Sequence, residues 1–274
     1  MSATPQSGVA PAIELRRVSL AFDEKPVLAE ISFAIVPGET LFLLGVTGTG
    51  KSVLLKMMVG LRKPDAGEIL VNGRNIVPFS EAELSGLRSR MGIVFQEGAL
   101  FDSLDVYENV CYRLREEKVR DEAEIERRVR EVLSFVEMEE AIDKMPSQLS
   151  GGMQRRVSIA RAIISQPSIM LYDSPTAGLD PLTANTIILL IAKLRDAQHV
   201  TSVVVTHRLQ DAFFLSTFAY SVEEGGPVGA ASRAQRHAIR EVRFIILRDT
   251  RLYFEGNREE LVRSQDPYLR KFLT

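Results

Sequence analysis

The sequence predicts an α/β fold in which a parallel sheet is covered by helices on both faces. Three short apolar runs, at residues 40–44, 168–172 and 201–205, have the continuous hydrophobicity of buried parallel strands. Segments with helical spacing separate these runs, and each run ends at polar residues. Because ligands bind at the carboxyl ends of the strands in such sheets, we expect the functional site there.

The composition is that of an ordinary folded protein without a strong charge. The 274 residues are 45% hydrophobic and 26% charged, with a net charge of −2, so nothing favours nucleic acid as a partner. Apolar runs are short, as at 187–192, whereas a membrane span needs about twenty residues. Any membrane role must therefore come through a partner. The single cysteine, Cys111, excludes an internal disulfide and is interpreted as a small buried hydrophobe.

The first half of the chain predicts two further parts. Residues 13–35 alternate apolar and polar side chains in short pieces, which is typical of an antiparallel sheet. Residues 121–143 carry apolar side chains at helical spacing among many charges, which predicts an amphipathic helix. With its flanking segments, this helix indicates a helical subdomain over 96–164, and the core that contains the parallel sheet is expected over 13–95 and 165–220.

The last fifty residues predict an insertion followed by a hairpin. Residues 222–242 are rich in glycine, alanine and charge, and we expect a mobile insertion there, either a flexible surface loop or a regulatory site. Two apolar runs, 243–247 and 251–254, flank a short polar link and predict a β-hairpin. A helix is expected to complete the C-terminal part, 243–274.

A glycine-rich segment follows the first apolar run and fits the phosphate-binding pattern GxxxxGK[ST]. Glycines allow the backbone N–H groups to approach phosphate oxygens, and the helix after the loop directs its positive end at them. Lys51 would reach the β- and γ-phosphates, and Ser52 would offer its hydroxyl to Mg²⁺. The alternative is an unrelated glycine-rich turn. The residues predicted to contact nucleotide here are Gly45, Val46, Thr47, Gly48, Thr49, Gly50, Lys51, Ser52 and Val53.

A second candidate anion site lies about a hundred residues later. Ser150 is a good N-cap for a helical pattern, and Gly151 and Gly152 leave backbone N–H groups accessible. A plain capped helix would explain this segment if it stood alone. Asp173 ends the second apolar run, where it could hold Mg²⁺ through water, and His207 follows the third, where it could donate to a γ-phosphate.

Together these segments resemble the ABC ATPase family over essentially the whole chain. The resemblance implies a P-loop NTPase (RecA-like) core that binds ATP and Mg²⁺, with metal contacts from Ser52, Gln96 and Asp173. It also implies a head-to-tail homodimer, in which Ser150–Gly152 of one chain meets the ATP held by the other. The motifs that the resemblance assigns are Walker A at 45–52, the Q-loop at Gln96, the signature at 149–154, Walker B at 169–173, the D-loop at 177–180, the switch histidine at His207 and an adenine-stacking aromatic at Phe22.

The chain departs from this family at one catalytic position. The family usually has glutamate directly after the Walker B aspartate, and here Ser174 stands there. A hydroxyl cannot act as a general base at neutral pH, and loss of such a base costs about 10²- to 10⁴-fold in rate. Either hydrolysis is slow, with compensation from His207 or a partner, or this branch uses another polarising group. Lys51, Gln96, Asp173, Ser174 and His207 are the predicted catalytic residues.

The segment at 91–102, with 106–110, looks most like the ATPases of Mla-type, Mce-associated phospholipid transporters. The resemblance implies a peripheral protein on the cytoplasmic face of the inner membrane, bound to a transmembrane permease and through it to an Mce-type protein. Leu100 and Phe101 beside Asp102 suit a docking surface or local core packing equally. An importer ATPase for another substrate, a soluble ABC protein and a regulatory pseudo-ATPase are the alternatives.

Overall fold

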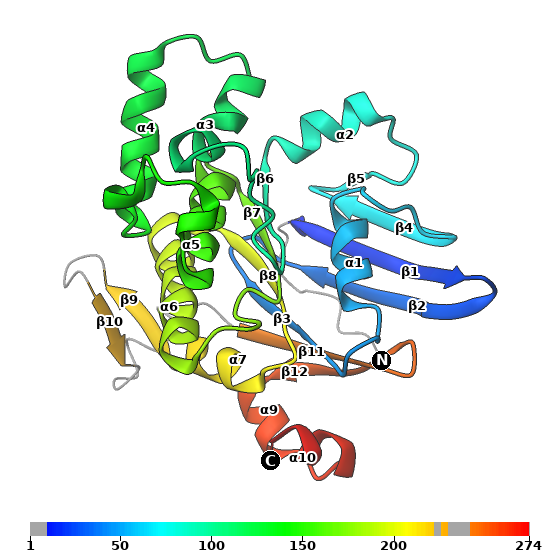
Figure 1. The fold of residues 1–274 in the computed structure, drawn as a ribbon. Helices are drawn as coiled ribbons and strands as arrows, with labels where there is room; N and C mark the ends of the chain where they lie inside the picture. The colour runs from blue at the N-terminus through cyan, green and yellow to red at the C-terminus, as the bar shows by residue number, and fades with distance from the viewer. Residues whose placement is uncertain (1–9, 222–225, 230–241, 274) are drawn as a thin grey trace.

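The computed structural model describes residues 10–221, 226–229 and 242–273, and its centre is a six-stranded sheet (Figure 1). The strand order is β12-β11-β3-β8-β7-β6, in which all neighbours are parallel except β12 on β11. This arrangement confirms the predicted α/β class. The strands are β3 (Thr40–Leu44), β6 (Met91–Val94), β7 (Ile169–Asp173), β8 (Thr201–Val205), β11 (Val242–Arg248) and β12 (Arg251–Asn257).

The continuous apolar runs arise because the central strands are buried on both faces. Every residue of β3, β7 and β8 is buried. Along β3, Leu41 and Leu43 belong to an apolar cluster with α1 (Lys51–Met58) and the antiparallel sheet, whereas Phe42 and Leu44 belong to a second cluster with the helices. The sheet therefore separates two cores, and its polar chemistry is confined to strand ends.

A second, antiparallel sheet covers one face, in the order β2-β1-β4-β5. The expected short pieces over 13–35 are two long strands, β1 (Ile13–Phe22) and β2 (Lys25–Ile35), joined by β4 (Ala66–Val71) and β5 (Arg74–Asn75). Register shifts interrupt the β1–β2 pairing, and Arg17 and Glu30 have left-handed backbones. Such bulges reset the alternation of side chains, so long strands look like short ones in the sequence.

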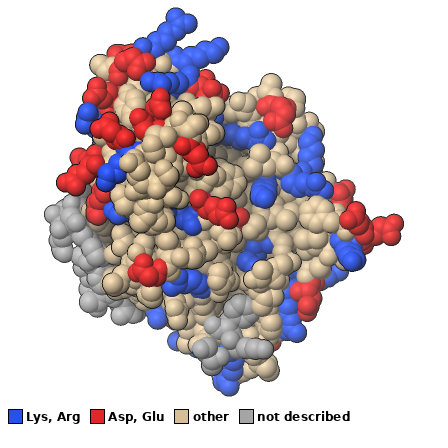
Figure 2. Space-filling model, in the orientation of Figure 1, with Lys and Arg blue, Asp and Glu red and all other residues tan. Residues whose placement is uncertain are grey.

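The helices fall into two groups, one that forms a separate lobe and one that covers the sheet. Between β6 and β7 lie α3, α4 and α5, which stand apart from β1 and β2 (Figure 1). Acidic and basic side chains are interspersed over this lobe, whereas the middle of the same face is mostly neutral (Figure 2). The remaining bounds are α2 (Glu81–Arg88), α3 (Val106–Glu116), α4 (Glu122–Phe135), η1 (Glu139–Ala141), η2 (Pro146–Gln148), α5 (Gly151–Ile163), α6 (Pro181–Gln198), α7 (Leu209–Leu215), α9 (Arg258–Arg263) and α10 (Pro267–Leu273).

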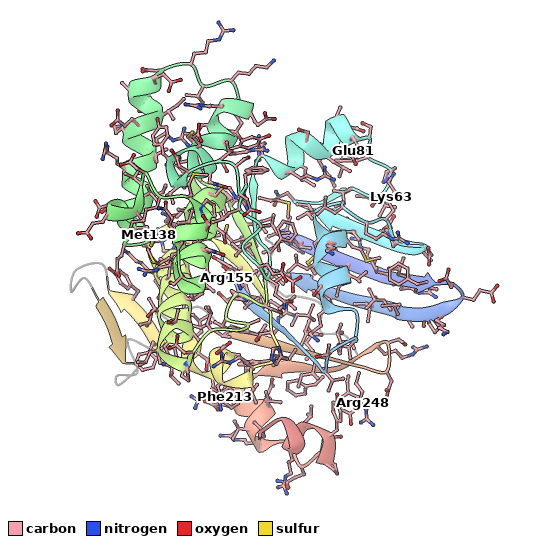
Figure 3. All side chains as sticks on the ribbon, viewed as in Figure 1. Lys63, Glu81, Met138, Arg155, Phe213 and Arg248 are labelled. Carbon is pink, nitrogen blue, oxygen red and sulfur yellow. The ribbon has the colours of Figure 1, made fainter. Side chains whose placement is uncertain are left out.

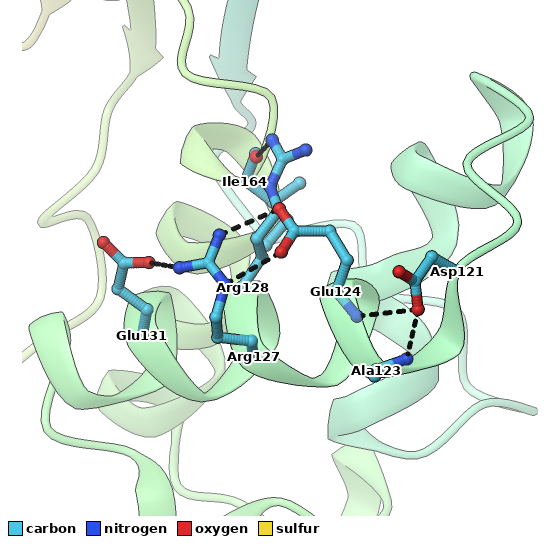
Figure 4. Close-up of polar contacts among 7 residues, drawn as sticks. All are labelled: Asp121, Ala123, Glu124, Arg127, Arg128, Glu131 and Ile164. Atoms are coloured by element: carbon cyan, nitrogen blue, oxygen red, sulfur yellow. Dashed lines mark hydrogen bonds and ion pairs between the residues drawn. The ribbon is translucent and has the colours of Figure 1, made fainter.

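Helix α4 is capped at its start and anchored to α5 (Figure 4). The Asp121 carboxylate accepts from the N–H groups of Ala123 and Glu124, which satisfies two free donors of the first turn. Arg128 donates to the carbonyl of Ile164 at 2.6 Å, so α4 is tied to the end of α5. On the exposed side of the helix, the Arg127 guanidinium pairs with the carboxylates of Glu124 and Glu131.

The prediction that this helix continues to residue 143 is wrong. The helix ends at Phe135, Glu137 has a left-handed backbone (φ 58°), and the Met138 N–H donates to the Leu133 carbonyl at 2.9 Å. This is a Schellman motif, which closes a helix even when the residue is not glycine. Because Met138 and Ala141 beyond it are still buried, the apolar pattern continues although the helix does not.

The C-terminal hairpin is confirmed, with β11 paired antiparallel to β12. Asp249 and Thr250 both have left-handed φ, which suits the tight two-residue turn. In the predicted insertion at 222–242, residues 226–229 form β10 (Gly226–Gly229), paired with β9 (Phe218–Ser221). Residues 222–225 and 230–241 lie outside the described residues. No helix in the described part is long and apolar enough to cross a membrane.

Candidate functional site

The phosphate-binding loop lies between β3 and α1, and its glycines Gly45, Gly48 and Gly50 all have a positive φ that other residues rarely adopt. Gly45 has φ 148°, and a Cβ there would lie 2.7 Å from the Leu247 carbonyl oxygen. Gly50 has φ 86° and packs against Leu28, where a Cβ would lie 2.9 Å from the side chain. The loop therefore passes closely over neighbouring strands, while Val46, Thr47 and Gly48 at its crest are exposed.

Lys51 is the first residue of α1, and its charge is held over the loop. Its Nζ donates to the carbonyls of Gly45 (2.8 Å) and Val46 (2.7 Å), and to the Thr49 hydroxyl (3.3 Å). Burial lowers the pKa of Lys51, against an opposing effect of nearby Asp173. A desolvated ammonium held only by neutral oxygens would gain from an anionic ligand.

Among the described side chains, none caps the N-terminus of α1, so its N–H groups are free for a bound anion. Its N-cap is Gly50, so no side chain caps the helix, and no acidic residue lies in the first turn. The free N–H groups and the positive end of the helix dipole therefore face the loop. Together with Lys51, this makes an anion site of the kind that takes polyphosphate.

Ser52 and Asp173 meet beside this loop although 121 residues separate them. The Ser52 Oγ donates to Asp173 Oδ1 at 2.9 Å, and the Asp173 side chain is buried at the end of β7. Two hard oxygens at one point suit Mg²⁺. The described residues contain no group of three or more His, Cys, Asp and Glu that could hold a metal alone. A metal here would therefore take most of its oxygens from phosphate and water.

Ser174 follows Asp173 in a strained backbone conformation. Its φ is 50°, its N–H donates to the Val205 carbonyl at 2.8 Å, and its Oγ lies 3.5 Å from Asp173 Oδ1. The hydroxyl thus faces the aspartate, and position 174 supplies no carboxylate to this edge of the sheet.

The ends of four neighbouring strands bring the predicted residues to one edge. In the order β3, β8, β7 and β6, these strands are followed by Gly45, His207, Asp173 with Ser174, and Gln96. Gln96 and His207 are both exposed. Because parallel strands share one direction, their carboxyl ends lie side by side, and the polar residues that follow them share one face.

The predicted adenine-stacking residue lies at the turn between β1 and β2. Phe22 is 41% exposed, and the Arg62 guanidinium lies 4.9 Å from its ring centroid. An aromatic ring with a cation against it and a large exposed surface is suited to stack on a base. Val53, the last residue of the predicted phosphate-binding set, is partly buried within α1.

The second candidate anion site is the N-terminus of α5. Ser150 caps it by accepting from the Met153 N–H at 3.3 Å, and both Ser150 and Gly151 are exposed. Gly152 is buried, and a Cβ there would lie 2.3 Å from Thr183 Cγ2 at the start of α6. In the described part of the chain, no hydrogen bond joins residues 150–152 to the phosphate-binding loop.

Sequence reasoning missed the residues that hold the loops in place. Arg155 in α5 is 6% exposed and donates to backbone carbonyls of two different loops. The Thr176 hydroxyl donates to the buried carboxylate of Asp211 in α7, and Arg208 donates to the Thr176 carbonyl. One signal was available: Gly152, Arg155 and Ile159 share one helix face by their spacing, so the charge of Arg155 lies on the buried stripe.

A glycine-rich loop between a buried strand and a helix, with a serine and an aspartate meeting beside it, defines a P-loop nucleotide-binding protein. The family model described as ABC transporter matches residues 28–177. The chain is also similar to the intermembrane phospholipid transport system ATP-binding protein MlaF of Haemophilus influenzae, with 32% identity over 95% of this chain and 89% of the relative. This chain therefore belongs to the ABC transporter family, whose cassettes bind and hydrolyse ATP.

Other relatives and solved structures give the same family. MlaF of Escherichia coli is 33% identical over 98% of this chain and 90% of its own. The probable ribonucleotide transport ATP-binding protein mkl of Mycobacterium leprae is 33% identical over 96% of this chain and 68% of its own. The dimeric structure of the bacterial ABC transporter cassette MJ0796 superposes with a TM-score of 0.74 at 31% identity, covering 89% of this chain and 98% of that cassette.

Proposed function

We propose that this chain is the ATP-hydrolysing subunit of a transporter that moves phospholipid between membranes. The observation that carries the proposal is the similarity to two MlaF proteins along nearly the full length of both chains. The geometry supports the ATP-binding half, since a lysine, a helix N-terminus and a serine–aspartate pair converge on one loop.

The residues of the chain would act on Mg-ATP in distinct ways. Lys51 would exchange its carbonyl partners for phosphate oxygens, and Phe22 would stack on the adenine. Ser52, Asp173 and Gln96 would hold Mg²⁺, which supplies charge neutralisation for the phosphates. His207 at the end of β8 would donate to the γ-phosphate, and its bonding would change when that phosphate leaves.

We also propose that two copies work head to tail. The Ser150 end of α5 is exposed and shares no hydrogen bond with the phosphate loop of its own chain within the described residues, so it would serve the nucleotide of the other copy. The MJ0796 structures, one of a dimer and one of a dimeric post-hydrolysis state bound to ADP and Pi, are precedents. Binding of ATP would then join the two copies, and hydrolysis would release them.

The membrane partner would dock beside the Q-loop. Phe101 is 41% exposed and lies against the exposed Tyr112, with ring centroids 4.7 Å apart. Leu100 is partly buried, and Asp102 is exposed. This mixed apolar and acidic surface suits a permease, through which an Mce-type protein would associate. The chain would then lie at the cytoplasmic face of the inner membrane as a peripheral subunit.

Two alternatives have specific observations behind them. The similarity to mkl favours a ribonucleotide as cargo, because the identity is as high, although the chain spans 68% of that protein. The serine at 174 favours a regulatory ATPase-like subunit that binds nucleotide and hydrolyses it slowly.

The decisive experiment uses the complex purified from solubilised membranes with its permease. Reconstituted in liposomes, the wild-type complex should transfer labelled phospholipid in an ATP-dependent manner, and the Lys51→Ala complex should not. Stimulation of ATP turnover by ribonucleotides, with no lipid transfer, would replace phospholipid with the cargo of the mkl-like alternative. Lipid transfer that proceeds with bound but unhydrolysed ATP would instead favour the regulatory alternative.

A further inference from the structure

Arg155 joins three segments that carry separate parts of the proposed site. Its Nη1 donates to the carbonyl of Phe95 at 2.8 Å, directly before Gln96. Its Nη2 donates to the carbonyl of Ala177 at 3.5 Å, at the start of the loop 177–180. Because Arg155 belongs to α5, whose first residues follow Ser150, one side chain links the predicted signature, Q-loop and D-loop. Figure 3 labels Arg155 near the centre of the view.

The cost of burying this side chain indicates that its position is not a matter of fold stability alone. Arg155 is 6% exposed, and desolvation lowers its pKa. Among the described residues, its Nε has no hydrogen-bond partner. A buried guanidinium with an unpaired N–H is expensive compared with an apolar residue of the same shape, which would fill the space without a desolvation penalty.

A second arginine holds the residue directly before the D-loop. Arg208, which precedes α7, donates from Nη1 to the Thr176 carbonyl at 3.5 Å. The Thr176 hydroxyl donates to the buried Asp211 carboxylate in α7. Consecutive carbonyls, those of Thr176 and Ala177, are therefore held by arginines from two elements, α5 and the segment after His207.

We infer that Arg155 is a positioning residue that couples the two nucleotide sites of the pair. It ties the loop of Gln96, which would contact the nucleotide of its own chain, to the helix and D-loop that would face the nucleotide of the other chain. A shift of either loop moves a carbonyl that the same planar cation holds, so neither site closes independently. This inference rests on the proposed head-to-tail pair.

Arg156 provides a matched control in the next position of the same helix. Its Nη1 donates to the carbonyls of Glu137 (3.2 Å) and Val136 (3.5 Å), which both lie in the helical lobe. Arg156 is therefore an arginine that also holds two backbone carbonyls, but within the described residues none of its hydrogen bonds goes to the Q-loop or the D-loop. Comparing Arg155→Gln with Arg156→Gln separates coupling from the general effect of removing a cation from α5.

The test measures ATP affinity, turnover per bound nucleotide and cooperativity in ATP in the permease complex, together with ATP-driven dimerisation of the purified chain. Arg155→Gln should leave ATP affinity unchanged, since its side chain donates to the carbonyls of Phe95 and Ala177, and neither residue is predicted to hold ATP. Turnover should fall on the order of tenfold, and cooperativity should be lost. Arg155→Lys, with a single compact cation, should restore thermal stability but not cooperativity. Arg156→Gln should leave turnover and cooperativity as in the wild type.

The outcomes distinguish failure of the coupling role of Arg155 from failure of the proposed function. An Arg155→Gln protein that keeps wild-type cooperativity, or whose turnover loss only follows a smaller folded fraction, would overturn the positioning role. A wild-type complex that neither binds ATP nor dimerises with it would overturn the proposed function itself. Normal wild-type behaviour with equal effects of Arg155→Gln and Arg156→Gln would overturn the coupling alone.

Discussion

Substitution of Gly152 by alanine introduces a methyl group where α5 meets α6. Its Cβ would lie 2.3 Å from Thr183 Cγ2, whereas carbon atoms in contact are about 3.5–4.0 Å apart. Thr183 is β-branched and lies in the first turn of α6, so it cannot easily rotate away. Overpacking of this kind costs about 1–3 kcal/mol, more than the roughly 0.5–1 kcal/mol that alanine gains over glycine in a helix. We expect a net loss of about 1–2 kcal/mol in the free energy of unfolding.

The same geometry predicts a rescue. Thr183→Ser removes Cγ2, and the next contacts of the added methyl, at 3.7 Å to Cβ and 3.9 Å to Oγ1 of residue 183, are ordinary. Urea unfolding of the wild type, both single variants and the double variant gives the coupling energy, which we expect to be favourable by about 1–2 kcal/mol. Gly86→Ala in α2 is the control, because nothing lies within 4 Å of its Cβ; it should stabilise the chain by about 0.5–1 kcal/mol. Gly152→Ala with wild-type stability, or a double variant no better than Gly152→Ala, would refute the packing argument.

Three further predictions concern the phosphate-binding edge. Ser174→Glu should raise ATP turnover of the permease complex by about 10²-fold if a missing base limits turnover. Unchanged turnover at equal ATP occupancy would show that Ser174 does not limit the rate. Lys51→Met should raise the thermal midpoint at neutral pH, because burial lowers the folded pKa of this lysine. The unfolded chain then binds the proton of Lys51 more tightly than the folded chain, so the stability of the wild type rises with pH between the folded and the unfolded pKa. The difference in thermal midpoint between Lys51→Met and the wild type should therefore shrink toward pH 10. A difference that does not change with pH would contradict this. Gly45→Ala should abolish ATP binding, because its Cβ meets the Leu247 carbonyl in addition to its positive φ. Gly48→Ala has only the backbone strain of φ 85°, with open space at its Cβ, and should weaken binding without abolishing it; equal affinities would argue against the close approach at Gly45.

The parts of the fold that the sequence predicts well are those in which local chemistry and tertiary packing agree. The three central strands are continuous apolar runs because both of their faces are buried, and Ser150 caps α5 because its side chain satisfies a free N–H. The end of α4 was missed because burial continues past Phe135 through residues whose backbone has already turned. The periodicity of apolar side chains indicates which residues are buried, but it indicates a helix only where the backbone remains helical.

The candidate site likewise contains residues that could be predicted from the sequence and residues that could not. Lys51, Ser52 and Asp173 could be named from the sequence because their chemistry lies in short motifs, and the strand order then brings their elements to one edge of the sheet. Arg155, Thr176 and Asp211 could not be assigned roles in this way, because their partners are backbone carbonyls and a hydroxyl of distant loops. Every residue has a backbone carbonyl, so no sequence pattern identifies the carbonyl to which a side chain will donate.

This distinction bears on how ATP hydrolysis would be controlled. Motif residues such as Lys51 would act on the nucleotide of their own chain, and single variants of them should abolish binding in the isolated chain and in the permease complex. The hydrogen bonds of Arg155 go to backbone carbonyls, so its loss should leave ATP binding by the isolated, monomeric chain unchanged and should affect turnover only when two copies close. If Ser174 makes the chemical step slow, closure and not hydrolysis becomes the event that does work on the permease, and the backbone-held loops then matter more to transport than the general base does.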